Sequence, residues 1–117
     1  MLIDEKFIQL WMDANRIEDR NEFLKKGMRD SMDSSDICKT MNLLEKIWDM
    51  AHLTMKEVVS GEGMSQRAFA ETLGAPKRTV EDWCRGLVHP PVYARLWLHI
   101  ILGHFSPEEW ARERTEP

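Results

Sequence analysis

The stretch that decides the fold is 65–83, which reads SQRAFAETLGAPKRTVEDW. Ser65 is a common N-cap residue, and the apolar residues after it have helical spacing. Gly74 stands where a left-handed helix C-cap is expected, and Pro76 fits the first turn of a second helix, because no amide donor is required there. The pattern therefore predicts two short helices joined by a sharp turn, the local pattern of a helix-turn-helix.

The two predicted helices span residues 66–73 and 77–85, and Gly86 ends the second one. Their inward-facing residues, judged from the apolar spacing, are Phe69, Ala70, Leu73, Val80 and Trp83. A loop at 87–90 then leads to a further helix, which Pro91 opens.

Followed by Gly86 and Pro90, the stretch 65–83 resembles the lambda-repressor-like (Xre-type) helix-turn-helix family, whose usual pattern is SQxxLAxxLGVxxxTVxxWExGxxxP. The match covers about residues 55–102. The chain departs from the pattern at three positions, none of which breaks the fold. These are Phe69 for the usual Leu, Ala75 for Val and Cys84 for Glu.

The resemblance implies an all-α fold, a lambda-repressor-like helix-turn-helix bundle of five helices. In that family the second motif helix, here 77–85, enters the major groove, and the first crosses the phosphate backbone. The chain is therefore expected to be a sequence-specific DNA-binding transcriptional regulator that represses its own or a neighbouring operon. The acidic helical lead and the segment TVEDWCRG also resemble small regulators of bacterial mobile elements.

Helical spacing defines the exposed face of the second motif helix, opposite Val80 and Trp83. Lys77 and Arg78, at its start, are candidates for contacts to base edges, because a bidentate contact to guanine is the commonest specific one. An acidic side chain on the same face can accept from a cytosine amino group. The predicted base-reading residues are Lys77, Arg78, Glu81 and Asp82.

Phosphate contacts are expected around the start of the first motif helix. Gln66 matches a family position that touches phosphate. Ser65 and Arg67 lie beside it, where free amides and the helix dipole favour an anion. The further phosphate candidates are Thr79, Arg85 and His89.

The same exposed face has a purely structural interpretation. Its charges form i,i+4 pairs, each worth only about 0.3–0.5 kcal/mol on an exposed helix. These pairs are Lys77–Glu81, Arg78–Asp82 and Glu81–Arg85. A face that neutralises itself attracts DNA less than a purely basic face, so a shallow salt dependence of binding is expected.

Apolar spacing of three and four predicts helices elsewhere in the chain. A first helix begins after Asp4, and a second, shorter one ends near Gly27. A polar loop at 29–36 follows, where Ser34, Ser35 or Asp36 caps a long helix. The apolar face of that helix carries Ile37, Met41, Leu44, Trp48, Ala51 and Met55. Thr54 is a candidate cap for a separate short helix, and Ser106 for a final turn.

The length of 117 residues fits one compact domain, or one small domain with an extension. The net charge of −4 is uneven: residues 1–64 carry −4, residues 65–104 carry +2 and residues 105–117 carry −2. The mildly basic block contains the motif. The sequence predicts three parts: an acidic N-terminal helical extension at 1–36, the helix-turn-helix domain at 37–104 and a short C-terminal tail at 105–117.

Several classes of function find no support in the sequence. His99 and His104 are five residues apart, not on one helical face, and neither cysteine stands at ligand spacing from them, so no metal site and no cofactor are expected. No nucleophile lies beside a base in a recognisable pattern, so no enzyme is predicted. The sequence shows neither the basic-then-apolar pattern of a signal peptide nor an apolar stretch as long as a membrane span, so the protein is expected in the cytoplasm. The tryptophans at 11, 48, 83 and 97 fall on apolar helical faces and are expected in the core.

Double-stranded DNA is the expected partner, bound by a homodimer on a palindromic site. The dimer surface is either the final helix, with Tyr93 and Trp97, or the apolar face at 37–55. Two alternatives remain open. The chain is an antitoxin that blocks a toxin with the acidic residues 1–36, or it is a protein-binding inhibitor whose acidic helices mimic DNA.

Overall fold

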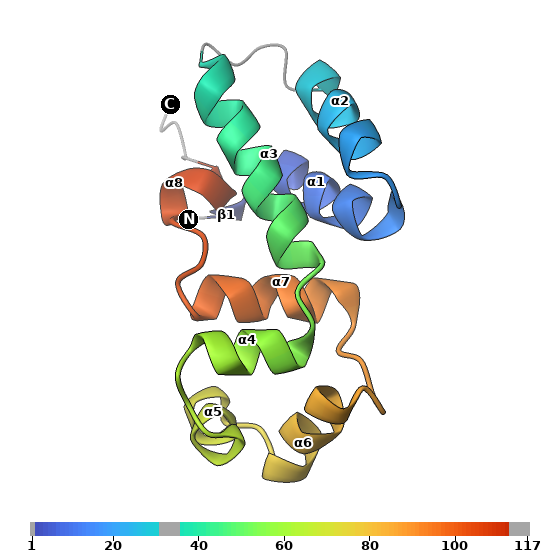
Figure 1. Ribbon diagram of the computed structural model, residues 1–117. Helices are drawn as coiled ribbons and strands as arrows, with labels where there is room; N and C mark the ends of the chain where they lie inside the picture. Colours follow the sequence, from blue (N-terminus) through green and yellow to red (C-terminus); the bar gives the residue numbers. More distant parts are fainter. Residues whose placement is uncertain (1, 31–35, 113–117) are drawn as a thin grey trace. The chain divides into compact units, whose positions relative to one another are not determined.

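The structure is a computed structural model that describes residues 2–30 and 36–112 (Figure 1). It is all-α apart from one pair of two-residue strands, as the sequence predicts. The chain divides into two compact units, Met1–His52 with Val92–Pro117 in one and Leu53–Pro91 in the other. Among the residues described, no helix combines the length and apolar character needed to cross a bilayer.

The boundaries of these units differ from the predicted boundaries at residues 36 and 104. The two helices of the predicted extension at 1–36 pack on helices from the predicted domain at 37–104. They share one apolar core with them, so they are not a separate extension. Part of the predicted tail at 105–117 also belongs to this unit, and residues 113–117 lie outside the described part of the chain.

In the first unit, the helices are α1 (Glu5–Arg16), α2 (Arg20–Asp30), α3 (Ile37–Ala51), α7 (Val92–Ile101) and α8 (Pro107–Trp110). The strands β1 (Leu2–Ile3) and β2 (Ala111–Arg112) pair antiparallel, with Leu2 opposite Arg112. The Asp4 amide donates to the Trp110 carbonyl at 2.9 Å, next to this pair. Residues far apart in the sequence thus meet in this unit. The two strands are too short to be predicted from a periodic pattern of apolar residues.

Local caps set most of these helix ends. The Asp4 side chain accepts from the Lys6 amide at 2.9 Å, and the Asp36 side chain accepts from the Lys39 amide at 3.0 Å, so both predicted caps are confirmed. The competing caps at Ser34 and Ser35 lie outside the described residues. The capping box of α8 from Ser106 is also present.

Aromatic side chains fill the core of the first unit. Phe7 and Phe105 meet edge to face with ring centroids 5.2 Å apart, and Trp11 and Phe23 are completely buried. The Trp11 indole nitrogen donates to the Val92 carbonyl at 2.7 Å, so its one polar atom is satisfied. This bond joins α1 to the start of α7, 81 residues later in the chain.

Gly27 does not end α2, contrary to the sequence prediction. The helix continues to Asp30, and Gly27 is buried within it. A Cβ atom at this position would lie 2.6 Å from Leu44 Cδ2, closer than real contacts allow. The glycine is needed for the close approach of α2 to α3, not for a turn. The predicted loop at 29–36 is correspondingly shorter, and its residues 31–35 lie outside the described part of the chain.

One buried carboxylate belongs to this unit. Asp13 accepts from Lys26 Nζ at 2.8 Å, from Arg16 Nη2 at 3.1 Å and from Gln9 Nε2 at 3.0 Å. Burial by itself would raise the pKa of Asp13, but the hydrogen bonds from Lys26, Arg16 and Gln9 outweigh it and hold the pKa below its ordinary value. Asp13 therefore fixes α1 to α2 as a charged group.

The second unit contains α4 (Met55–Gly61), α5 (Gln66–Leu73) and α6 (Lys77–Arg85). Thr54 and Glu57 form a reciprocal capping box, so α3 ends at Ala51 and Met55 opens a new helix. Helix α6 packs against both α4 and α5. The buried apolar residues of the unit are Met55, Val58, Val59, Phe69, Ala70 and Val80.

The prediction for the tryptophans is partly wrong. Trp11 is completely buried, and Trp48 and Trp83 are half-buried, but Trp97 is exposed. The apolar spacing of α7 is broad enough to include both a core face and an adjacent exposed face, and periodicity alone does not separate them.

Candidate nucleic-acid interface

The turn between α5 and α6 is built as the sequence predicts. Ser65 Oγ accepts from the Ala68 amide at 3.1 Å and caps α5. Gly74 ends α5 with φ of 68°, and the Ala75 amide reaches back to the Ala70 carbonyl at 2.9 Å. No atom lies within 4 Å of a Cβ built at Gly74, so its left-handed conformation, not lack of space, requires glycine here.

Relative to α6, Pro76 lies one position earlier than predicted, just before the first turn of the helix. It is the N-cap of α6 and not a residue of its first turn, and α6 has no side-chain cap. The Pro76 carbonyl accepts from the Thr79 amide at 3.0 Å. The helix then runs over the predicted residues and ends at Gly86, whose φ is 75°.

On the exposed face of α6, the cationic side chains are more exposed to solvent than the acidic ones. The side chains of Lys77, Arg78 and Arg85 are 59%, 79% and 59% exposed, whereas those of Glu81 and Asp82 are 25% and 23% exposed. An approaching polyanion therefore meets the ammonium and guanidinium groups first.

The predicted i,i+4 ion pairs are all present, and all are long. Glu81 lies 3.6 Å from Lys77 Nζ and 3.6 Å from Arg85 Nη2, and Asp82 Oδ1 lies 3.4 Å from Arg78 Nε. Good charge-assisted hydrogen bonds are about 2.7–2.9 Å long, so these pairs hold the cations loosely. The cationic side chains therefore lie near Glu81 and Asp82 but are not held in one position by them.

Asp82 is less accessible than its predicted base-reading role requires. Its Oδ1 is buried and makes no hydrogen bond with the residues described, although Arg78 Nε lies at ion-pair distance from it. Only the other carboxylate oxygen can face a base edge.

The predicted phosphate-binding residues lie in the same unit as α6. Ser65, Gln66 and Arg67 are exposed at the start of α5, and Arg67 pairs loosely with Glu71 at 3.6 Å. Arg85 is exposed at the end of α6, and His89 is exposed in the following loop. Thr79 is half-buried in α6, so it offers the least surface.

Two exposed apolar residues next to this face escaped the sequence analysis. Leu87 and Val88 follow Gly86, and both amides point back to the Asp82 carbonyl, at 3.0 and 3.4 Å. Exposed apolar side chains beside a DNA-reading helix can contact a thymine methyl group. Gly86 is the feature of the sequence from which their exposure could have been predicted, because a left-handed glycine cap turns the next two residues away from the helix axis.

The histidines and cysteines do not form a metal site in the residues described. The structure does bring His99 and His104 together, contrary to expectation, because Gly103 has φ of 80° and the chain folds back after α7. Their Nδ1 atoms are 2.7 Å apart, which is the distance of a hydrogen bond and not that of two ligands of one metal ion. Burial raises the pKa of the Cys84 thiol, which is half-buried in α6, so it is not an activated thiolate.

Comparison with known proteins adds no relative: no family model, no curated protein and no solved structure matches this chain.

Proposed function

We propose that this chain is a sequence-specific DNA-binding transcriptional regulator, a repressor, that reads the major groove with α6. The observation that carries the proposal is the face of α6, where exposed cations project past recessed acids. A short helix presented in this way after a glycine turn has the dimensions and chemistry of a groove-reading element.

The proposed roles follow from position and exposure. Lys77 and Arg78, at the start of α6, contact guanine edges, and Glu81 accepts from cytosine or orients its cationic neighbours. Gln66, Arg67 and the exposed Arg85 and His89 contact phosphates, with Ser65 and Thr79 as minor contributors. The proposal includes a homodimer on double-stranded DNA, in the cytoplasm, with no cofactor and no catalytic step.

A DNA-binding measurement tests the proposal. The double variant Lys77→Ala/Arg78→Ala should lose binding to the DNA upstream of its own gene by at least a hundredfold, measured by fluorescence anisotropy and by footprinting. The matched control is Lys25→Ala/Arg29→Ala, which removes the same charge from exposed positions on α2. Equal losses in the two variants, or no loss in the first, would refute the assignment of α6.

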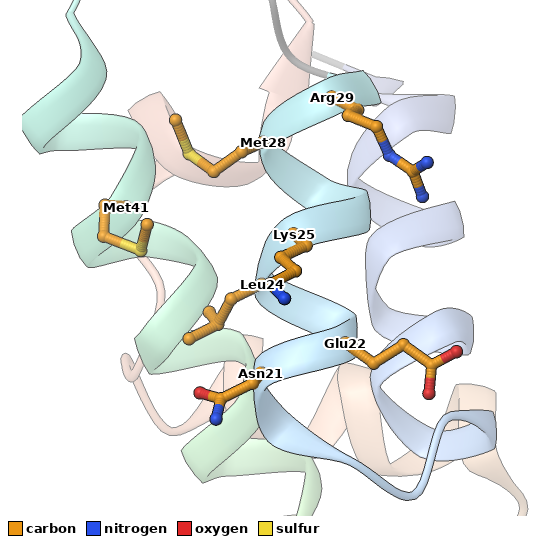
Figure 2. A pocket seen from close by; sticks show the side chains of 7 residues that line it. All are labelled: Asn21, Glu22, Leu24, Lys25, Met28, Arg29 and Met41. Carbon is orange, nitrogen blue, oxygen red and sulfur yellow. The ribbon is translucent and has the colours of Figure 1, made fainter.

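A groove in the first unit supports a second candidate, the antitoxin or protein-binding inhibitor. Leu24 and Met28 of α2 and Met41 of α3 point toward one another between the two helices, whereas Glu22 and Arg29 point away from α3 (Figure 2). Methionine-lined grooves adapt to the side chains of a partner helix. The complete lining is Asn21, Glu22, Leu24, Lys25, Met28, Arg29 and Met41.

Co-expression with the product of the neighbouring gene separates the two candidates. An antitoxin or inhibitor would co-purify with that product, and Met28→Lys would abolish the complex while Lys77→Ala/Arg78→Ala would not. Deleting residues 1–36 is unsuitable for this purpose, because it removes Phe7, Trp11 and Phe23 from the core.

A further inference from the structure

Asp82 carries a carboxylate oxygen that the fold leaves without a hydrogen bond. Its Oδ1 is buried and accepts no hydrogen bond from the part of the chain that the structure describes. Buried side-chain acceptors in folded proteins nearly always have a partner, so this exception calls for a cause. Arg78 Nε, one helical turn earlier on α6, lies 3.4 Å from this oxygen. The two groups are near enough for ionic attraction but are not aligned as a hydrogen bond.

The two partners of this ion pair differ in exposure. The Asp82 side chain is 23% exposed, whereas the Arg78 side chain is 79% exposed. A DNA base that approaches α6 therefore meets the guanidinium before the carboxylate. With one oxygen buried, Asp82 is poorly placed to accept from a cytosine amino group, but it is well placed to contact the inner end of Arg78.

A contact at Nε suits an arginine that reads guanine. A guanidinium group is planar and has five N–H donors, one on Nε and two on each terminal nitrogen. A carboxylate at Nε leaves both terminal nitrogens free, and these two can contact O6 and N7 of one guanine together. Asp82 thus favours one orientation of Arg78 without occupying the edge that would contact a base.

Glu81, the other acid of this face, is placed differently. Its carboxylate lies 3.6 Å from Lys77 Nζ and 3.6 Å from Arg85 Nη2, so it is shared between two cations. At Arg85 it lies against a terminal nitrogen, which belongs to the edge that a guanine would need. At Arg78 the carboxylate of Asp82 lies against Nε instead. Arg78 is therefore the better oriented of the two arginines of α6 for a base contact.

We propose that Asp82 is a positioning residue, which holds Arg78 in the orientation that selects guanine and does not itself contact a base. Binding to DNA displaces water from around α6, and opposite charges attract more strongly where water is excluded. Arg78 Nε then donates to Oδ1, so the buried oxygen obtains its hydrogen bond in the bound state. Guanine accepts from the terminal nitrogens at O6 and N7, whereas adenine presents a donor at N6 and is rejected. This role rests on the proposed function, since it requires that α6 reads the major groove.

Selection of binding sites from a randomised double-stranded DNA library, read by sequencing, tests the role of Asp82. Arg78→Ala should relax the preference at one guanine, which identifies the base that Arg78 contacts. Asp82→Ala should lower the preference for the same guanine over adenine by roughly fivefold or more, within the discrimination of a bidentate contact, and leave other positions selective. Asp82→Asn keeps the shape and one acceptor but loses the charge, so it should lower this preference by a smaller factor. Glu18→Ala, which removes the same charge from an exposed position of the first unit, is the control and should retain the preference.

Stability distinguishes positioning from a structural role. Because Asp82→Ala removes a buried acceptor that has no hydrogen bond, urea unfolding should show no loss of stability in this variant. A clear loss of stability, together with an equal loss of affinity for all sequences, would mean that Asp82 supports the fold and would overturn its assignment as a positioning residue.

The outcomes also separate the role of Asp82 from the proposed function. A wild type that selects an operator, with the guanine preference unchanged in Asp82→Ala, overturns the role of Asp82 alone. If Arg78→Ala relaxes no guanine, that role is overturned as well, although Lys77 would still support reading by α6. A wild type that selects no sequence at all refutes the proposed function, and the role of Asp82 falls with it.

Discussion

His99 Nδ1 and His104 Nδ1 face each other across 2.7 Å inside the first unit. Only one proton fits between two nitrogen atoms at this distance, so at least one of the two rings must remain neutral. His99 is the buried partner, packed against Trp11 and Phe105. Burial, together with the positive charges of His104 and Arg95, lowers the pKa of His99 to about 4.

This pair predicts a loss of stability in mild acid. The unfolded chain binds a proton at His99 below about pH 6.5, whereas the folded chain does so only near pH 4, so unfolding is favoured as the pH falls between these values. The full effect is roughly 3 kcal/mol in the free energy of unfolding, measured by urea titration at pH 7, 5.5 and 4.5. His99→Gln should flatten this dependence, and His89→Gln, in the exposed loop after α6, should not. Similar slopes in both variants would contradict the prediction.

Gly27→Ala should destabilise the protein although the glycine lies inside a helix. Alanine is favoured over glycine by about 1 kcal/mol in a helix, but overpacking a well-filled core costs about 1–3 kcal/mol. Here the new Cβ would press on Leu44, which is completely buried and cannot swing aside. A net loss of about 1 kcal/mol is expected in urea unfolding. Gly61→Ala is the control, since nothing lies within 4 Å of its Cβ; a gain of stability in both variants would be the contrary result.

Local signals in the sequence predicted the helices of the second unit well. The caps at Ser65, Gly74 and Gly86 act within one helical turn, so residue identity alone determines where α5 and α6 begin and end. The candidate face of α6 follows from the same bounds. The i,i+4 spacing also predicted its ion pairs, but it did not predict that the acids are recessed below the cations.

Tertiary contacts account for what the sequence did not predict. Gly27 has the residue type of a helix stop, but it lies inside α2, and the closeness of Leu44 explains why a glycine stands there. Trp97 has the spacing of a core residue, yet α7 buries the neighbouring face. Residues 1–36 were predicted to be an acidic extension, but charge describes the surface of these helices and not the apolar core that they share with α3 and α7.

Glu81→Gln should increase binding to unrelated DNA more than binding to the operator. The change frees Lys77 and Arg85, which both pair with Glu81 at 3.6 Å, and removes one negative charge from the reading face. Each additional phosphate contact steepens the salt dependence by about 0.9 in log–log slope. A several-fold rise in non-specific affinity and a steeper slope are expected from anisotropy at 50–200 mM salt, a range in which such contacts are resolved. Glu18→Gln, which removes the same charge from an exposed position of the first unit, is the control of equal charge. Indistinguishable effects of the two changes would remove Glu81 from the reading face.

The stability of the first unit should depend on residues 1–36. Phe7 and Ile8 are neighbours on α1, but Phe7 is buried in the core and Ile8 is exposed. Phe7→Ala should therefore lower the free energy of unfolding by about 3–5 kcal/mol, and Ile8→Ala by less than about 1 kcal/mol. Thermal unfolding followed by circular dichroism measures both.

The same reasoning predicts that a chain truncated to 37–117 loses its cooperative melting transition. Truncation removes Phe7, Trp11 and Phe23 together, and it exposes the faces of α3 and α7 on which these side chains pack. It also removes the donor to the Val92 carbonyl and leaves that acceptor without the Trp11 indole. If the truncated chain melted cooperatively near the temperature of the full chain, residues 1–36 would be an independent extension after all, and the core assigned to the first unit would be wrong.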